Sequence, residues 1–150
     1  MTPFRWKNCF ADVQTYRHGR TVQSYFDDVI MPALAIVQRK IEALGRGDNP
    51  GDAFSQDDMS LVLQEAKMAF GLSIQSIWER QLRVYLQGCA RELAPAESLE
   101  DRVGGANWAV LQKLFLRLRG IELSDFPTYP ELDLLQHLEF GIRQIGRAHV

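Results

Sequence analysis

The sequence predicts an all-α fold, a helical bundle of about four main helices around one long central helix. Three observations support this prediction. The stretch Ser55–Leu93 repeats apolar residues at helical spacing over nearly its whole length. Residues 20–44, residues 106–119 and the segment after Thr128 show the same period. No segment alternates apolar and polar residues as a half-buried strand does. At 150 residues we expect a single helical domain spanning 1–150.

The central helix has its own start and stop signals. Ser55, with Asp58 three residues later, predicts a capping box at its beginning. Pro95 predicts its end, because the residue before a proline is pushed out of helical geometry. Between them one stripe carries the apolar side chains that we expect to face the neighbouring helices: Leu61, Met68, Leu72, Leu82, Leu86, Cys89 and Leu93. Gly71 and Gly88 interrupt this helix at a cost of about 1 kcal/mol each, and would allow a neighbour to approach closely.

Glu79 is the unusual residue of the central helix. On a helical wheel it falls inside the apolar stripe, between Leu72 and Leu82. One interpretation is structural: Arg83 lies four residues on and can pair with it on the helix surface. The other is functional: a carboxylate held in a cleft with a perturbed pKa is a candidate catalytic residue. Both interpretations stay open at this point.

The remaining segments are less distinctive. We expect residues 1–19 to form an irregular arm, basic with interleaved aromatics, which is either a solvated arm or a nucleic-acid footprint. The helix over 20–44 contains Pro32, which predicts a kink or two helices that meet there. Gly45 is a candidate C-cap, and the loop that follows has no phosphate-binding GxxxxGK[ST] pattern. The helix over 106–119 is predicted to turn its apolar side inward, with Trp108, Leu111, Leu114, Phe115 and Leu118.

Composition narrows the functional classes. The apolar fraction of 46% suits a globular core, and the net charge of −2 gives no overall attraction to nucleic acid or anionic membranes. Only a local basic patch would support RNA binding. The longest apolar run, Val29–Val37, is far too short to span a membrane. The start of the chain lacks the apolar run of a signal peptide, so we expect a cytoplasmic protein that contacts no membrane.

Cysteine and histidine usage predicts no metal and no cofactor. Cys9 and Cys89 form neither a disulfide framework nor a CxxC motif, and Cys89 is predicted to be a small core residue. His137 falls off the apolar stripe of the last helix, and no second metal ligand stands at a useful spacing from it.

The C-terminal residues carry a family resemblance. Arg143 and His149 are separated by five residues late in a helical bundle, and this pair resembles the arginine–histidine motif of HEPN domains. The central helix, with Glu79 inside SIWERQLRVYL, is similar to the long core helix of those bundles. The resemblance implies an RNA-directed module, a metal-independent ribonuclease or a toxin–antitoxin component, often dimeric. In such a site Arg143 would stabilise phosphate charge and a histidine would act as general acid or base.

A second interpretation applies to the same residues. The string IGRAHV, residues 145–150, resembles a short sequencing adapter translated in one frame. His149 would then be an artefact, residues 144–150 a non-native tail, and the chain would be truncated within its last helix. Under this interpretation we expect Gln144–Val150 to fray or merely to extend that helix.

Two functional hypotheses follow, from different classes. The first is a HEPN-like, RNA-directed module that is ribonucleolytic when intact, with Arg143 and Glu79 as its candidate catalytic residues. The second is a non-catalytic helical module for protein interaction or dimerisation. The partners are accordingly RNA or a protein, a second copy of the chain included.

Overall fold

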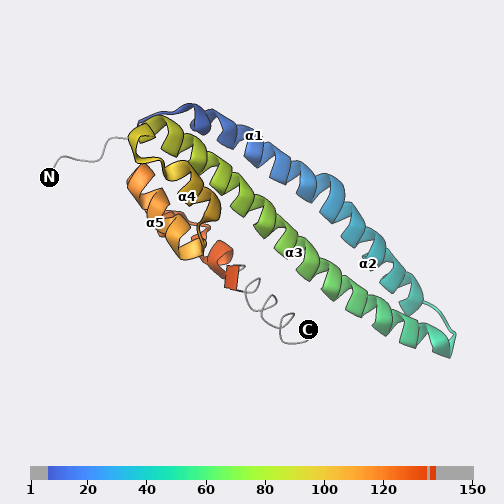
Figure 1. Ribbon diagram of the computed structural model, residues 1–150. Coiled ribbons are helices and arrows are strands. Elements are labelled where there is room, and N and C mark those ends of the chain that lie inside the picture. The colour runs from blue at the N-terminus through green and yellow to red at the C-terminus, as the bar shows by residue number, and fades with distance from the viewer. Residues whose placement is uncertain (1–6, 135, 138–150) are drawn as a thin grey trace. The chain divides into compact units, whose positions relative to one another are not determined.

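All the regular elements that the structure describes are helical, which confirms the all-α class. The computed structural model describes residues 7–134, 136 and 137 (Figure 1). In chain order its elements are α1 (Phe10–Tyr25), the π-helical turn η1 (Phe26–Ile30), α2 (Met31–Gly45), α3 (Pro50–Leu93), the 3-10 turn η2 (Pro95–Glu97), α4 (Leu99–Gly105), α5 (Trp108–Arg119) and the 3-10 turn η3 (Leu123–Asp125). Residues 129–134, 136 and 137 are also helical. The predicted long central helix is α3.

The chain divides into two compact units, which are described separately. Unit 1 contains Met1–Gly19 and Gln75–Val150, and unit 2 contains Arg20–Ile74. Helices α1 and α3 each contribute residues to both units.

The prediction that residues 1–19 are irregular is wrong from Phe10 onward, where α1 begins. Local hydrogen bonds start this helix: the Cys9 N–H donates to Asp12 Oδ2 over 2.9 Å, and the Asp12 N–H donates to the Cys9 carbonyl over 3.0 Å. A side chain that accepts from an orphan N–H of the first turn is a helix-start device. The apolar period is weak here because Ala11 is the one residue that α1 buries, a strip too narrow to give a pattern.

Gly88 lets α1 approach α3 closely within unit 1. A Cβ built on Gly88 would lie 2.9 Å from the Ala11 Cβ, closer than two carbon atoms pack. The expectation that a glycine inside the long helix permits a close neighbour is therefore confirmed at Gly88. The cost of a glycine in a helix, about 1 kcal/mol, is offset by this contact.

Helix α3 begins at Pro50, five residues before the predicted start, so the proposed Ser55–Asp58 capping box is wrong. Asn49 starts the helix instead: its side-chain Oδ1 accepts from the Gly51 N–H over 3.0 Å, and its carbonyl accepts from the Asp52 N–H. Proline suits the first turn, where its missing N–H would have no partner anyway. The helix ends at Leu93 as predicted.

The predicted interruption near Pro32 is present as the π-helical turn η1. The Met31 N–H donates to the Phe26 carbonyl, five residues back, and the regular α2 then starts with Pro32 in its first turn. A proline has no N–H and its ring crowds the preceding turn, so the chain widens by one residue just ahead of it. The single predicted helix over 20–44 is therefore the end of α1, η1 and α2.

The core of unit 1 forms between the C-terminal part of α3 and the short helices α4 and α5, which Figure 1 shows beside it. Four of the five predicted inward residues of α5 are buried, namely Leu111, Leu114, Phe115 and Leu118, whereas Trp108 is only partly buried against the core. They meet Leu82, Leu86 and Cys89 from α3 in one cluster. An Asn107 cap starts α5, with its side chain accepting from the Val110 N–H, and Gly120 ends it in the left-handed conformation (φ 70°).

Unit 2 is a helical hairpin in which α2 runs antiparallel to the N-terminal part of α3. Two hydrogen bonds set the register: Tyr25 Oη lies 2.6 Å from Ser73 Oγ, and Gln56 Nε2 donates to the Ile41 carbonyl over 3.2 Å. Ile30, at 2% exposed, is the single buried residue of 20–74, all of which the structure describes. Within the described ranges, no helix has both the length and the apolarity needed to cross a bilayer.

Candidate functional site

Glu79 takes part in a bridging network within unit 1. Its Oε1 lies 2.5 Å from Arg83 Nη2, and its Oε2 accepts from Gln136 Nε2 over 2.8 Å. Arg83 Nη1 in turn donates to the carbonyls of Val103 (3.1 Å) and Ala106 (2.6 Å). The local ion pair of the structural interpretation is thus present, and it ties α3 to the connection between α4 and α5. A catalytic role for Glu79 stays a prediction.

The arginine–histidine pair of the HEPN resemblance lies beyond this network in the sequence. Arg143, His149 and the predicted tail Gln144–Val150 all lie outside the described residues. His137 is exposed, with Nδ1 2.7 Å from the Asp133 carbonyl oxygen. No group of three or more histidine, cysteine or carboxylate side chains gathers as a metal site in the part of the chain that the structure describes.

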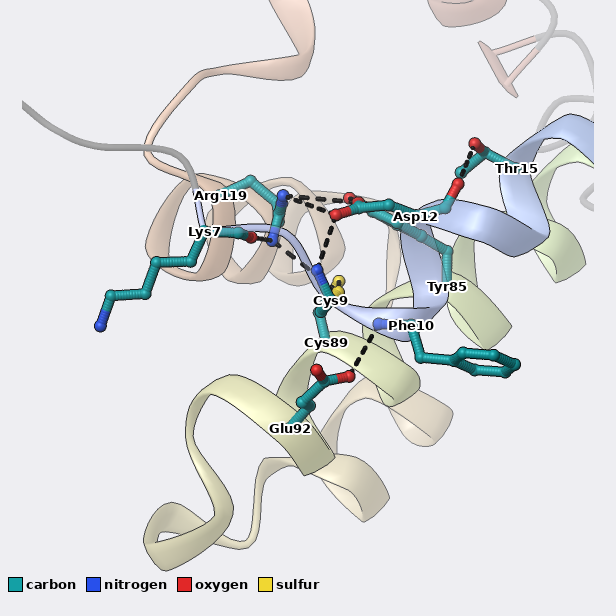
Figure 2. Close-up of polar contacts among 9 residues, drawn as sticks. All are labelled: Lys7, Cys9, Phe10, Asp12, Thr15, Tyr85, Cys89, Glu92 and Arg119. Atoms are coloured by element: carbon teal, nitrogen blue, oxygen red, sulfur yellow. Dashed lines mark hydrogen bonds and ion pairs between the residues drawn. The ribbon is translucent and has the colours of Figure 1, made fainter.

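A second polar network joins the start of α1 to α3 and α5. We call it the arm cluster; its members are Lys7, Cys9, Asp12, Tyr85, Cys89 and Arg119 (Figure 2). Arg119 is 1% exposed, and its Nη1 donates to the Lys7 carbonyl over 3.1 Å. Its Nη2 lies 3.4 Å from Asp12 Oδ1, which also accepts from the Tyr85 hydroxyl over 2.8 Å. Three segments distant in sequence are therefore held together by one carboxylate and one guanidinium.

Burial keeps two members of the arm cluster neutral. It raises the pKa of the Tyr85 hydroxyl well above its ordinary value, and the hydrogen bond to Asp12 adds to the rise. Burial also raises the pKa of the Cys89 thiol to about 12, with a further contribution from the hydrogen bond to Cys9. Loss of hydration penalises the charged form of each group. At neutral pH the cluster therefore carries one ion pair, and its role in the described fold is to hold the N-terminal arm in place.

Sequence reasoning missed most of the arm cluster. Arg119 stands in the last turn of α5, where a cation suits the helix dipole, so its sequence position alone gives no reason to expect burial. No local pattern connects it with Asp12 or Tyr85, which are remote in sequence. The one available signal was a cationic side chain on the inward side of α5, next to Leu118. The prediction for Cys89 is confirmed, since it is fully buried in the core.

The hairpin of unit 2 carries the largest uncovered apolar surface. On α3, Phe54, Leu61 and Met68 follow one another at intervals of seven residues and are 75%, 61% and 55% exposed. Seven residues are nearly two helical turns, so these side chains lie close to one line along the helix. Farther along the predicted stripe, Leu82 and Cys89 are buried in unit 1. The predicted burial of the stripe is therefore right for its C-terminal part and wrong for Leu61 and Met68.

The first half of the hairpin adds to this surface. We define the hairpin surface as the large exposed apolar side chains of unit 2: Phe26, Val29, Met31, Ile36, Phe54, Leu61, Val62 and Met68. A groove of about 590 Å³ lies between the end of α2 and the start of α3. Lys40 lines it from α2, and Asp52 and Asp58 line it from α3. Unit 2 thus combines exposed apolar side chains with charges of both signs.

These features define an all-helical protein with a well-packed unit and an apolar helical hairpin. Comparison with models of known protein families, with curated proteins and with solved structures gave no match.

Proposed function

We propose that this protein is a helical interaction module that self-associates through the hairpin surface, so that two hairpins form a four-helix bundle. One observation carries the proposal. Unit 2 exposes eight large apolar side chains and buries one residue, Ile30. Helices in water owe most of their stability to the packing of an apolar side. Because this hairpin buries only Ile30 within itself, its exposed apolar side chains would gain packing by contact with a partner.

The size of the surface suits a second copy of the chain. The 25 residues of α3 that belong to unit 2 extend for about 37 Å at 1.5 Å per residue. Two helices side by side, each roughly 10 Å across, give a strip of about 700 Å². A stable interface of standard size takes about 800 Å² from each partner. The strip is slightly smaller than this but lies within the range of stable interfaces, about 600–1,000 Å² per partner, so its burial against its own copy supports a dimer without help from unit 1.

The charges of the hairpin favour its own copy as partner. Helix α2 carries two cationic side chains and one acidic one, whereas residues 50–74 carry four acidic side chains and one lysine. If α2 of one copy packs on α3 of the other, Lys40 and Arg39 meet the Asp57, Asp58 and Glu65 side of the partner helix. A two-fold axis then places α3 of the first copy against α2 of the second with the same pairing of charges, as an isologous interface requires.

Sedimentation of the full chain at increasing concentration tests the proposal. We expect the wild type to be a dimer in the micromolar range. Leu61→Glu places a charge in the middle of the hairpin surface and should yield a helical monomer, because an unpaired carboxylate is costly to bury. The matched control is Val84→Glu, since Val84 is a 55% exposed residue on the same helix but belongs to unit 1. This variant should remain dimeric.

Hydrogen exchange gives a second measurement that does not depend on a variant. Amides of residues 20–74 should exchange more slowly as the wild-type concentration rises, while those of α5 should not change. A wild type that stays monomeric over the whole range overturns the proposal. Equal dissociation of the Leu61→Glu and Val84→Glu variants would place the interface elsewhere and overturn it as well.

A further inference from the structure

Two free thiols lie side by side in the arm cluster, although they are 80 residues apart in the sequence. Cys9 Sγ is 3.5 Å from Cys89 Sγ, and the side chains are 6% and 0% exposed. Figure 2 shows the two sulfur atoms next to each other, beneath the Arg119 guanidinium. We propose that Cys9 and Cys89 form a reversible disulfide that locks the N-terminal arm onto α3.

The distance between the two sulfur atoms is short enough for a small movement to form the bond. A disulfide needs the sulfur atoms about 2.05 Å apart, so they must approach by about 1.5 Å. Cys9 precedes the first turn of α1 and lies outside any helix, so its side chain can rotate while its backbone stays hydrogen-bonded to Asp12. Gly88, next to Cys89, already brings α1 unusually close to α3. The required movement is therefore confined to the end of the arm.

A reagent can reach the two thiols from the surface next to Cys9. Lys7 and Asn8 are exposed, and they continue directly into Cys9. A cavity of about 320 Å³ is lined by Phe10 and Gly88, the sequence neighbours of the two cysteines, together with Arg91 and Glu92. One end of a small disulfide such as oxidised glutathione can reach this cavity, whose charged side chains are Glu92 and Arg91, the latter paired with Glu100. Displacement of Lys7, Asn8 and Cys9 from the core then exposes the Cys9 sulfur.

The chemistry is a pair of thiol–disulfide exchanges. The Cys9 sulfur, after loss of its proton, attacks one sulfur of oxidised glutathione; that S–S bond breaks and one glutathione thiolate leaves. The Cys89 sulfur then gives up its proton and attacks Cys9 Sγ in the mixed disulfide, and the second glutathione thiolate leaves. Two electrons pass to the reagent and the two protons go to the departing thiolates. Arg119 Nη1 is 4.0 Å from Cys9 Sγ and stabilises the negative charge during the first step.

The bond would change how the arm is held. In the reduced protein the arm is held by the hydrogen bond from Arg119 to the Lys7 carbonyl and by that from the Phe10 N–H to Glu92, 2.8 Å long. In the oxidised protein a covalent link closes a loop of 80 residues between the arm and α3. Any opening of the arm at Cys9 is then blocked by the covalent link.

The experiment equilibrates the full chain in graded mixtures of reduced and oxidised glutathione, followed by acid quenching and intact-mass measurement. We expect a species lighter by about 2 Da, with Cys9 and Cys89 joined in its peptide map. The same titration in guanidinium provides the comparison. Because the fold brings the thiols together, the native protein should oxidise at a glutathione disulfide concentration at least about tenfold lower than the unfolded chain requires.

Variants identify the residues. Cys9→Ala and Cys89→Ala should each abolish the internal disulfide, and circular dichroism shows whether they remain helical. The wild-type comparison with and without guanidinium stands even if a variant does not fold. Oxidation that is no easier in the native protein than in guanidinium would overturn the proposal. A disulfide between two copies, or a stable mixed disulfide with no internal bond, would also overturn it.

Discussion

Arg119 illustrates at the scale of one residue how a charge is accommodated inside unit 1. Removal of an isolated guanidinium from water costs several kcal/mol, so a buried arginine requires partners. Asp12 supplies the opposite charge and the Lys7 carbonyl accepts from Nη1. Both partners belong to the N-terminal arm and α1. The burial of Arg119 therefore depends on the arm being in place, and the position of the arm depends on Arg119.

The neutral groups beside this ion pair predict a loss of stability at high pH. Cys89 and Tyr85 both have a raised pKa in the folded protein. The groups facing them are Cys9, Asp12 and Arg119. A cysteine in the unfolded chain titrates near pH 9, and folded Cys89 near pH 12. The unfolded state therefore loses this proton first as pH rises. The contribution of Cys89 to folding stability is fully present below about pH 9 and is lost progressively as pH rises toward 12.

Urea unfolding under reducing conditions at several pH values measures this effect. We expect the midpoint to fall from about pH 9 upward. In Cys89→Ala the fall should be shallower, since one of the two groups is absent. A wild-type midpoint that does not change between pH 8 and about pH 11 would contradict the assignment of these two groups as buried and neutral.

At the scale of elements, α3 has different surroundings along its length. Its C-terminal part packs against α4 and α5, where Leu86 is fully buried. Its N-terminal part packs mainly against α2, and Leu61 remains 61% exposed. Leu86 and Leu61 are therefore two leucines of one helix in different environments. Truncation of a buried leucine leaves a cavity and lowers the free energy of unfolding far more than truncation of an exposed one.

We expect Leu86→Ala to lower the free energy of unfolding by about 2–5 kcal/mol. Leu61→Ala, the matched control, should lower it by less than about 0.5 kcal/mol when measured at a concentration where the chain is monomeric. Tryptophan fluorescence is a suitable signal, because Trp78 and Trp108 stack edge to face in unit 1 with ring centroids 5.6 Å apart. Equal losses in the two variants would show that the two parts of α3 are not packed as described.

At the scale of the whole molecule, the resemblance to HEPN domains predicts cleavage of single-stranded RNA without added metal. Arg143 would stabilise the phosphate charge in that reaction. The assay compares the wild type with Arg143→Ala in the presence of a chelator, and Lys113→Ala controls for the mere loss of a positive charge. If the resemblance reflects function, only Arg143→Ala loses activity. Equal cleavage by all three proteins, or none by the intact protein with its native C-terminal residues, would eliminate the RNA-directed hypothesis and leave self-association.

Much of the architecture can be predicted from the pattern of apolar residues. The helical class, the long α3, its end before Pro95, the break at Pro32 and the inward residues of α5 all depend on local rules. Local rules failed where an element has a weak pattern. Helix α1 buries only Ala11, so nothing in residues 10–19 distinguished a helix from an irregular arm.

The candidate sites were harder to predict than the elements. The Glu79–Arg83 pair was foreseeable because the two residues are four apart on one helix. The arm cluster was not, since Asp12, Tyr85 and Arg119 come together only when three separate elements pack. The proximity of Cys9 and Cys89 likewise follows from the close approach at Gly88, which no spacing rule contains.

The sequence by itself determined that this chain is helical, where most of its helices run and which side of each is apolar. These properties depend on the spacing of residues three and four positions apart, and that spacing is given directly by the sequence. Only the tertiary structure decided which parts of an apolar stripe are covered. Leu82 and Leu86 are buried because α4 and α5 pack on the C-terminal part of α3, whereas Leu61 and Met68 lie in the part whose main neighbour is α2 and remain exposed. Burial is a property of the neighbours that fold against a residue, and those neighbours are distant in sequence.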